Sequence, residues 1–262
     1  MSSRIAVTGG TGLLGALVVE RLATQGAEAR VISRRPRPAG SRDWAVADLR
    51  TGQGVRDALA GADVVVHCAT GFGRQAETQL ARTVVDAARR TGRPHLVYIS
   101  IVGVDRVPLG YYQGKLAAEQ LIERSGLPYT ILRATQFHDM LRAIFARLVR
   151  LPVMPVPDIR LQPIDSGEVA DRLADITTGE PAGRVPDIGG PRVQHAGELA
   201  RIFLRATARQ RPVLPIRLPG NTFRAYRADG HLAAEDAVGT ITFEDHLAAH
   251  HAPLGTAYRD RP

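Results

Sequence analysis

Lys115 is the only lysine in the chain, and its setting suits proton transfer. All the other members of the 34 lysines and arginines are arginine. Tyr111 stands four residues earlier, at the start of a helical pattern, so both side chains would share one helix face. An adjacent ammonium favours the phenolate, and a compact ammonium fits ribose hydroxyls better than a planar arginine fork does. The spacing predicts an acid–base pair at a nucleotide site; the alternative is a solvated lysine on a helix.

The glycine-rich stretch VTGGTGLLG lies between the first expected strand and the first expected helix. Gly10, Gly12 and Gly15 have GxGxxG spacing, and Gly9 offers a second spacing in the same stretch. Such glycines permit a tight turn and bring the backbone close to a pyrophosphate. The free N–H groups at the N-terminus of the helix attract phosphates. The stretch therefore predicts a dinucleotide-binding site.

The end of the second expected strand bears on the choice of dinucleotide. An acidic residue about 20 residues beyond the glycines would bind the ribose 2′-hydroxyl of NAD. This chain has Ser33, Arg34 and Arg35 there, without a carboxylate. Two guanidinium groups and a hydroxyl suit a 2′-phosphate. These residues favour NADP over NAD; the alternative is that they are ordinary members of an arginine-rich chain.

Two further strand ends lie on the side where open α/β sheets bind ligands. Asp48 and Leu49 end the third expected strand, and the Asp48 carboxylate could accept a hydrogen bond from an adenine amino group. Cys68, Ala69 and Thr70 end the fourth, where small residues would let the backbone approach a ribose. Cys68 has no activating partner in the sequence, so we interpret it as a small apolar residue rather than a nucleophile.

The elements that must position these residues are strands and helices. Short β-branched runs alternate with helical patterns along the chain. This order predicts an α/β fold with a doubly wound parallel sheet. We expect a core domain over residues 1–150 and a smaller C-terminal substrate lobe over 151–262. The expected strands are 4–9, 28–33, 44–49, 63–68, 95–100 and 128–133, and the expected helices are 12–25, 53–60, 76–91, 112–125, 138–150, 166–178 and 196–209.

Composition narrows the class of protein further. The net charge of +8 invites a nucleic-acid interpretation, but the arginines are scattered, so we expect no nucleic-acid partner. Cys68 is the only cysteine, and no metal-ligand spacing occurs, so we expect no disulfide and no metal. The N-terminal stretch lacks a signal-peptide pattern, and no apolar run reaches the ~20 residues of a membrane span. These features predict a cytoplasmic protein without a membrane partner.

Several motifs together resemble the short-chain dehydrogenase/reductase superfamily, most closely its atypical, NmrA-like NAD(P)-binding branch. They are TGGTGLLG, VADL, HLVYIS, YYQGKLAAE, SGLPYTILRATQF, LQPID and DIGGP, spread from residue 4 to about residue 190, with a looser likeness at TITFEDHL. The resemblance implies a Rossmann-like sheet of about seven parallel strands and a small C-terminal lobe.

The resemblance also implies functional residues. Tyr111 and Lys115 would form the catalytic pair, assisted by Ser100. The cofactor would contact Gly9, Thr11, Gly12, Leu13, Leu14, Gly15, Ser33, Arg34, Arg35, Asp48, Leu49, Cys68, Ala69, Thr70 and Lys115. Gln136 and Phe137 follow the sixth expected strand and would line the substrate pocket, although core packing explains Phe137 equally well.

One position departs from the family pattern. Oxidoreductases of this family carry a serine at or just after the fifth strand, where it binds the substrate carbonyl. Ser100 stands there, but the usual serine position two residues after Ile99 is Ile101. Thr70 and Gln136 are alternative donors.

The leading hypothesis is an NADP-dependent oxidoreductase acting on a small carbonyl, alcohol, quinone or enone, with Tyr111 as the general acid. The alternatives are a non-catalytic NAD(P)-binding redox sensor and an epimerase, dehydratase or cyclase. The 138–150 pattern leaves open whether the protein is a homo-oligomer.

Overall fold

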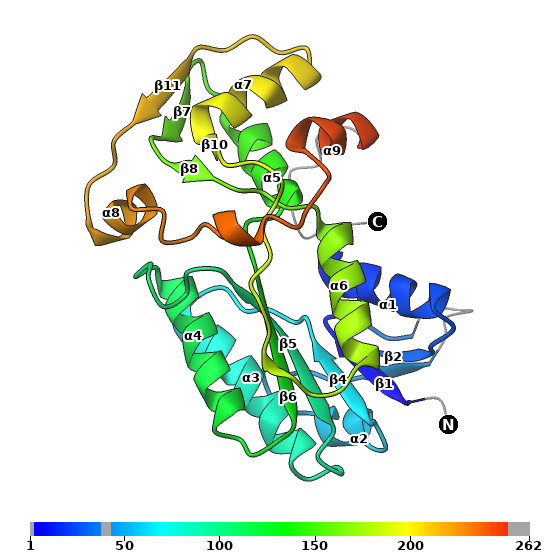
Figure 1. Ribbon diagram of the computed structural model, residues 1–262. Helices are drawn as coiled ribbons and strands as arrows, with labels where there is room; N and C mark the ends of the chain where they lie inside the picture. The colour runs from blue at the N-terminus through cyan, green and yellow to red at the C-terminus, as the bar shows by residue number, and fades with distance from the viewer. Residues whose placement is uncertain (1–2, 38–42, 251–262) are drawn as a thin grey trace. The chain divides into compact units, whose positions relative to one another are not determined.

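The β-branched runs form a seven-stranded parallel sheet in a computed structural model that describes residues 3–37 and 43–250 (Figure 1). The strand order β3-β2-β1-β4-β5-β6-β9 is that of a doubly wound, Rossmann-like sheet. This confirms the predicted fold class. The strands are β1 Ile5–Thr8, β2 Ala29–Ser33, β3 Trp44–Val46, β4 Val64–His67, β5 His95–Ile101, β6 Tyr129–Ala134 and β9 Gly183–Arg184.

The third strand is shorter than the sequence suggests. It ends at Val46, whereas the apolar pattern predicts a strand to residue 49. The difference arises because Asp48 begins a tight turn, in which the Gly52 N–H donates to the Asp48 carbonyl at 2.8 Å. The Leu49 side chain nevertheless packs into the core, which explains the apolar pattern.

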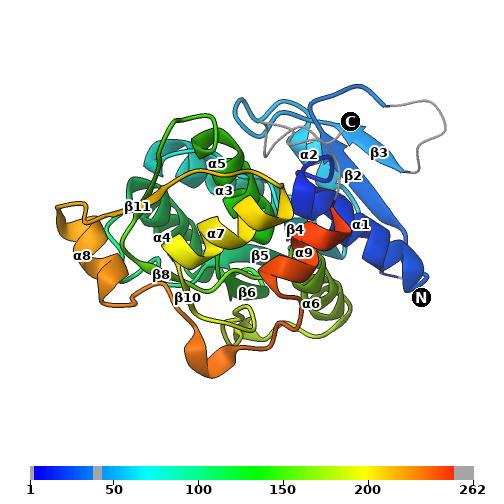
Figure 2. The same cartoon turned by 90° about the horizontal axis from the view of Figure 1, so that it is seen from above.

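Helices cover both faces of the sheet, as parallel strands with crossover connections require. Helices α3 and α4 lie side by side on one face, and α1 and α6 cover the other (Figures 1 and 2). The Arg21 guanidinium donates to the Asp171 carboxylate at 2.5 Å, which links α1 to α6. The helices are α1 Leu13–Thr24, α2 Val55–Leu59, α3 Arg74–Ala88, α4 Gly110–Glu123 and α6 Ser166–Thr178.

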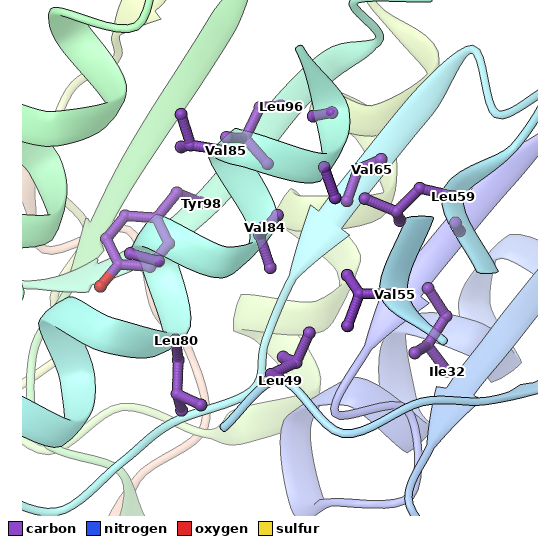
Figure 3. Packing of buried hydrophobic residues seen from close by; sticks show 14 of the residues in the cluster. Ile32, Leu49, Val55, Leu59, Val65, Leu80, Val84, Val85, Leu96 and Tyr98 are labelled. Atoms are coloured by element: carbon purple, nitrogen blue, oxygen red, sulfur yellow. The ribbon is translucent and has the colours of Figure 1, made fainter. Parts of the chain in front are cut away.

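One apolar core lies between the sheet and the helices α2, α3 and α4. Figure 3 shows side chains of β4 and β5 meeting Val84 and Val85 of α3. Tyr98 of β5 belongs to this cluster and is fully buried. Its ring stacks on that of His67 with 5.4 Å between ring centres, whereas its hydroxyl reaches a polar partner described below.

The chain divides into two compact units, each built from separated segments. Unit 1 comprises residues 1–100, 110–133 and 169–186 and contains nearly all of the parallel sheet. Unit 2 comprises residues 101–109, 134–168 and 187–262. The expected division at residue 150 into a core domain and a lobe stays a prediction about folding domains.

Unit 2 has an apolar core of its own. Phe145 of α5, Phe203 of α7 and Phe243 of α9 pack together in it. Two small sheets, β10-β8 and β11-β7, complete the unit. Its elements are α5 His138–Leu148, β7 Met154–Pro157, β8 Arg160–Leu161, β10 Gln194–His195, α7 Ala196–Ala206, β11 Val213–Ile216, α8 Asn221–Arg227, a 3-10 turn at Ala234–Asp236 and α9 Phe243–Ala249.

Among the residues that the structure describes, no helix combines the length and the apolar character needed to cross a bilayer.

Candidate active site

The glycine-rich turn connects β1 to α1 in unit 1. The Gly12 N–H donates to the Gly9 carbonyl at 2.8 Å, and Gly9 has a φ of +68°, which favours glycine. A Cβ on Gly15 would lie 2.3 Å from the Gly9 carbonyl oxygen, so only glycine fits there. The turn is therefore as tight as the sequence predicts.

This turn fits a dinucleotide pyrophosphate. Helix α1 begins after Gly12 without a side-chain cap, so no side chain takes up the N–H groups of its first turn. Those groups belong to Leu13, Leu14 and Gly15, and Thr11 immediately precedes them. Uncapped N–H groups at the start of a helix bind phosphate well.

Ser33, at the end of β2, links the glycine-rich turn to the arginines. Its side chain is buried, and its Oγ accepts a hydrogen bond from the Arg35 N–H at 3.1 Å. The Thr11 hydroxyl lies 3.4 Å from the same oxygen. Arg34 and Arg35 are both exposed. The Trp44 indole donates to the Arg35 carbonyl at 3.1 Å, which fixes the backbone of this segment.

The Asp48 carboxylate already takes part in the local turn. Its Oδ1 accepts a hydrogen bond from the Arg50 N–H at 2.9 Å. Leu49 is buried in the core, so its side chain faces away from solvent. A role for either residue in adenine binding stays a prediction.

The end of β4 lies directly against the glycine-rich turn. A Cβ on Gly9 would lie 2.7 Å from the Ala69 Cα, and the Cys68 N–H donates to the Thr8 carbonyl at 3.1 Å. Burial raises the pKa of the Cys68 thiol to about 12, so it is protonated at neutral pH. Such a thiol is a poor nucleophile, which agrees with the interpretation of Cys68 as a small apolar residue.

Tyr111 contacts Thr70 at this strand end. The two hydroxyl oxygens lie 2.7 Å apart, although the residues are 41 positions apart in the chain. Helix α4 carries Tyr111 in its first turn. The tyrosine therefore lies at the same edge of the sheet as the glycine-rich turn, where open α/β sheets bind ligands.

Lys115 is buried and forms an ion pair with Glu77 of α3. Its Nζ lies 2.8 Å from Glu77 Oε1, and it also donates to the Ile99 carbonyl at 3.1 Å. The ammonium lies 4.7 Å from the centre of the Tyr98 ring and 5.9 Å from that of Tyr111. The predicted pair thus occupies one neighbourhood, but the lysine has an anionic partner.

Glu77 is a site residue that sequence reasoning missed. Its side chain is fully shielded from solvent. Besides Lys115, Oε1 accepts a hydrogen bond from the Tyr98 hydroxyl at 2.9 Å. Oε2 accepts from the Thr70 hydroxyl at 2.9 Å and the Gly71 N–H at 2.7 Å. The available signal was a lone carboxylate on the face of α3 that also carries Leu80, Ala81 and Val84.

The surroundings keep both members of this ion pair charged. Burial opposes the charge on Lys115, but Tyr111, Tyr98 and Glu77 outweigh it and raise the lysine pKa well above its ordinary value. Burial likewise opposes ionisation of Glu77, yet the Lys115 ammonium and the Gly71 N–H lower the pKa of that carboxyl. At neutral pH the pair is an ammonium and a carboxylate.

Ser100, the expected serine partner, is buried in β5. Its hydroxyl oxygen has no hydrogen-bond partner among residues 3–37 and 43–250. Gln136 and Phe137 belong to unit 2. Gln136 is buried, and its amide nitrogen and oxygen both lack partners within the described part of the chain. Phe137 precedes α5 and pairs with Ile164 in an isolated β-bridge. Their predicted substrate contacts stay predictions.

Within residues 3–37 and 43–250, no group of three or more His, Cys, Asp or Glu side chains is placed to hold a metal ion.

Comparisons with known proteins agree with a nucleotide-binding fold. An uncharacterised protein of Mycobacterium tuberculosis is 33% identical over 232 residues, covering 82% of this chain and 24% of that protein. The chain thus spans about a quarter of the length of that relative. Quinone oxidoreductase 2 of Escherichia coli is 28% identical over 137 residues, covering 49% of this chain and 47% of that enzyme.

Solved structures show the same fold. The NADPH complex of the Escherichia coli NADPH-dependent quinone oxidoreductase superposes with a TM-score of 0.81 at 20% identity, covering 94% of this chain and 99% of that one. A nucleoside-diphosphate-sugar epimerase of Staphylococcus aureus gives a TM-score of 0.75 at 19% identity, covering 93% and 99%. The family model described as NAD(P)H-binding matches residues 9–150, so this chain belongs to the NAD(P)H-binding family.

Proposed function

We propose that this chain is an NADPH-dependent oxidoreductase that reduces a small carbonyl compound of the quinone or enone kind. The observation that carries the proposal is the 2.7 Å contact between the Tyr111 and Thr70 hydroxyls, at a strand end packed against Gly9. It supports a proton-donor role for Tyr111, because this strand end lies at the same edge of the sheet as the glycine-rich turn. The relationship to quinone oxidoreductase 2 supports the same class of reaction.

The preference for NADPH rests on the end of β2. Arg34 and Arg35 are exposed beside the buried Ser33, and no carboxylate occupies this position to repel a 2′-phosphate. Two guanidinium groups form strong charge-assisted hydrogen bonds with phosphate. The solved complex of the Escherichia coli quinone oxidoreductase contains NADPH, which supports the same choice here.

Reduction of a carbonyl requires one hydride and one proton. The bound cofactor would supply the hydride to the carbonyl carbon. The Tyr111 hydroxyl would donate its proton to the oxygen as negative charge develops there, and solvent would then return a proton to the phenolate. The ammonium of Lys115 lies near the Tyr111 ring, where it would stabilise the phenolate that the transfer leaves.

Phe72 supports a flat, conjugated substrate. Its ring stacks on that of Tyr111 with 5.9 Å between ring centres, and the residue is 59% exposed. An exposed aromatic face beside the proton donor favours a planar ring through offset stacking. A quinone or aryl enone has such a ring, whereas a small aliphatic carbonyl has none.

The test follows NADPH consumption with a panel of quinones, enones and aldehydes. The Tyr111→Phe variant should lower kcat by about 100-fold or more on any accepted substrate, because it removes the proton donor. Tyr129→Phe, an equivalent change on β6, serves as the matched control and should keep normal turnover. Normal turnover by Tyr111→Phe would contradict the acid role. If NADPH binds but is consumed with none of the compounds in the panel, the oxidoreductase proposal is contradicted.

A further inference from the structure

The buried Glu77 carboxylate joins three elements around the proposed proton donor. It contacts Lys115 of α4, Tyr98 of β5 and the Thr70–Gly71 segment after β4. Buried charges are costly to desolvate and occur where partners compensate for them. Here each carboxylate oxygen has two donors, all between 2.7 and 2.9 Å from it.

Helix packing brings Glu77 to this position. Gly114 of α4 lies against α3, where a Cβ would be 3.0 Å from the Arg74 Cα and 3.0 Å from the Glu77 Cβ. The absence of a side chain at Gly114 therefore lets α3 approach α4 closely. The carboxylate consequently reaches Lys115, the next residue along α4.

The hydrogen-bond directions around Thr70 follow from the charge on Glu77. A carboxylate only accepts, so the single Thr70 hydroxyl proton is donated to Glu77 Oε2. The Thr70 oxygen is then an acceptor, and the Tyr111 hydroxyl must donate to it across their 2.7 Å contact. Glu77 thus fixes the direction of a chain of hydrogen bonds that ends at Tyr111. To act as the acid, the Tyr111 O–H must turn from Thr70 to a substrate oxygen.

The same carboxylate offsets the charge of Lys115. An uncompensated ammonium near a phenol would favour the phenolate, but a reductase needs the phenol in its protonated form to supply a proton. The ion pair with Glu77 leaves the neighbourhood of Tyr111 with one positive and one negative charge. Besides Tyr111, the titratable groups that interact with this pair are Tyr98 of β5, His67 of β4 and Cys68, which follows β4.

We propose that Glu77 is a positioning residue that acts through Thr70 and Lys115: it holds the Tyr111 hydroxyl in place and offsets the positive charge beside it. Because its side chain is fully buried, Glu77 would act on the phenol without touching the substrate. This inference rests on the proposed function, since it assigns a partner to the proton donor of the reductase.

Two single variants test the charge component in opposite directions. In Glu77→Gln the amide oxygen can still accept from Thr70 and Gly71, but the negative charge beside Lys115 is lost. Tyr111 should then lose its proton about one pH unit lower, and the alkaline limb of the kcat/KM profile should move equally. Lys115→Met leaves the carboxylate without its cation and should move the limb to higher pH. If Glu77 had a purely structural role, the two variants would not shift the alkaline limb in opposite directions.

Two readouts report the result. The first is the pH profile of NADPH consumption. The second is a titration of Tyr111 in the cofactor-free protein by NMR with carbon-13 at the tyrosine ring carbon that bears the hydroxyl. Glu119→Gln is the matched control, since Glu119 of α4 forms a buried ion pair of 2.6 Å with Arg133. Unchanged Tyr111 titration in Glu77→Gln, relative to Glu119→Gln, would overturn the proposal.

Two further measurements keep the test decisive if Glu77→Gln does not fold. Glu77→Gln combined with Lys115→Met removes both charges, and its Tyr111 should titrate about one pH unit below that of Lys115→Met alone. Thr70→Val removes the linking hydroxyl at an exposed residue and should lower kcat about tenfold, with rescue by Thr70→Ser. Equal titrations of the single and double variants, or no rescue by serine, would contradict the role of Glu77.

These results separate the two proposals. Normal turnover by Tyr111→Phe would remove the acid role itself. Loss of turnover in Tyr111→Phe together with an unmoved profile in Glu77→Gln would retain the acid and reject Glu77 as its positioning residue.

Discussion

Glu77 and Lys115 form a 2.8 Å ion pair in which the two side chains are 0% and 4% exposed. The ammonium has three protons, and two of them point to Glu77 and the Ile99 carbonyl. At most one remains for a ribose hydroxyl. The lysine therefore joins α4 to α3 and β5, and its predicted contact with the cofactor would use the remaining proton.

The stability of the protein should depend on both members of this ion pair. Lys115→Met should lower the free energy of unfolding by about 3–5 kcal/mol, because it leaves a buried carboxylate unpaired. The double variant Glu77→Gln with Lys115→Met should recover most of this loss, since it leaves no buried charge. Urea unfolding of the wild type and these variants measures both values. A double variant as unstable as the single one would contradict the explanation.

His67 should make stability depend on pH. Burial lowers the pKa of His67 to about 4, against 6.5 for an ordinary histidine. Protons therefore bind the unfolded chain more tightly, and the stability present above pH 6.5 is lost as pH falls toward 4. The stability difference between wild type and His67→Asn should fall by about 3 kcal/mol from pH 7 to pH 4. A constant difference would show that His67 is protonated equally in both states.

Gly15→Ala should abolish cofactor binding. The added Cβ would lie 2.3 Å from the Gly9 carbonyl oxygen, so the turn must open and its N–H groups must move. We expect a loss of NADPH affinity of at least about 100-fold by isothermal titration, with loss of stability. Gly179→Ala is the control, because its nearest contact would be an ordinary 3.5 Å. Unchanged affinity in Gly15→Ala would remove the turn from the cofactor site.

Arg34 and Arg35 should set the preference for NADPH. Replacing both by alanine should weaken NADPH binding about 10- to 100-fold and leave NADH binding nearly unchanged, because only NADPH carries the 2′-phosphate. Arg56→Ala, at another exposed arginine on α2, measures the effect of removing one positive charge elsewhere on the surface. Equal losses for NADPH and NADH would show that the arginines attract the cofactor without recognising the 2′-phosphate.

Phe72 should affect planar substrates more than aliphatic ones. Phe72→Ala removes the exposed ring that stacks on Tyr111, so KM for a quinone should rise about three- to tenfold. Kinetics with a quinone and an aliphatic aldehyde compare the two classes. An equal rise for both would indicate a general disturbance of Tyr111 rather than recognition of a flat ring.

Features that depend on neighbouring residues along the chain could be predicted without the structure. The β-branched runs and helical spacings predicted the parallel sheet, and α6 was predicted with its observed ends, 166–178. The glycine spacing predicted the tight turn before α1, because glycine alone tolerates its backbone geometry. Helical periodicity likewise put Tyr111 and Lys115 on one face of α4.

The tertiary structure alone decided the partners of these residues. Glu77 is 38 positions before Lys115, and Thr70 is 41 before Tyr111. Local periodicity gives the direction of each side chain but not the distance between helices, which here depends on the close contact at Gly114. The position of Glu77 on an apolar helix face indicates burial but does not identify its partners. Only the packing of α3 on α4 shows that it neutralises the single lysine and directs the hydroxyl that reaches Tyr111.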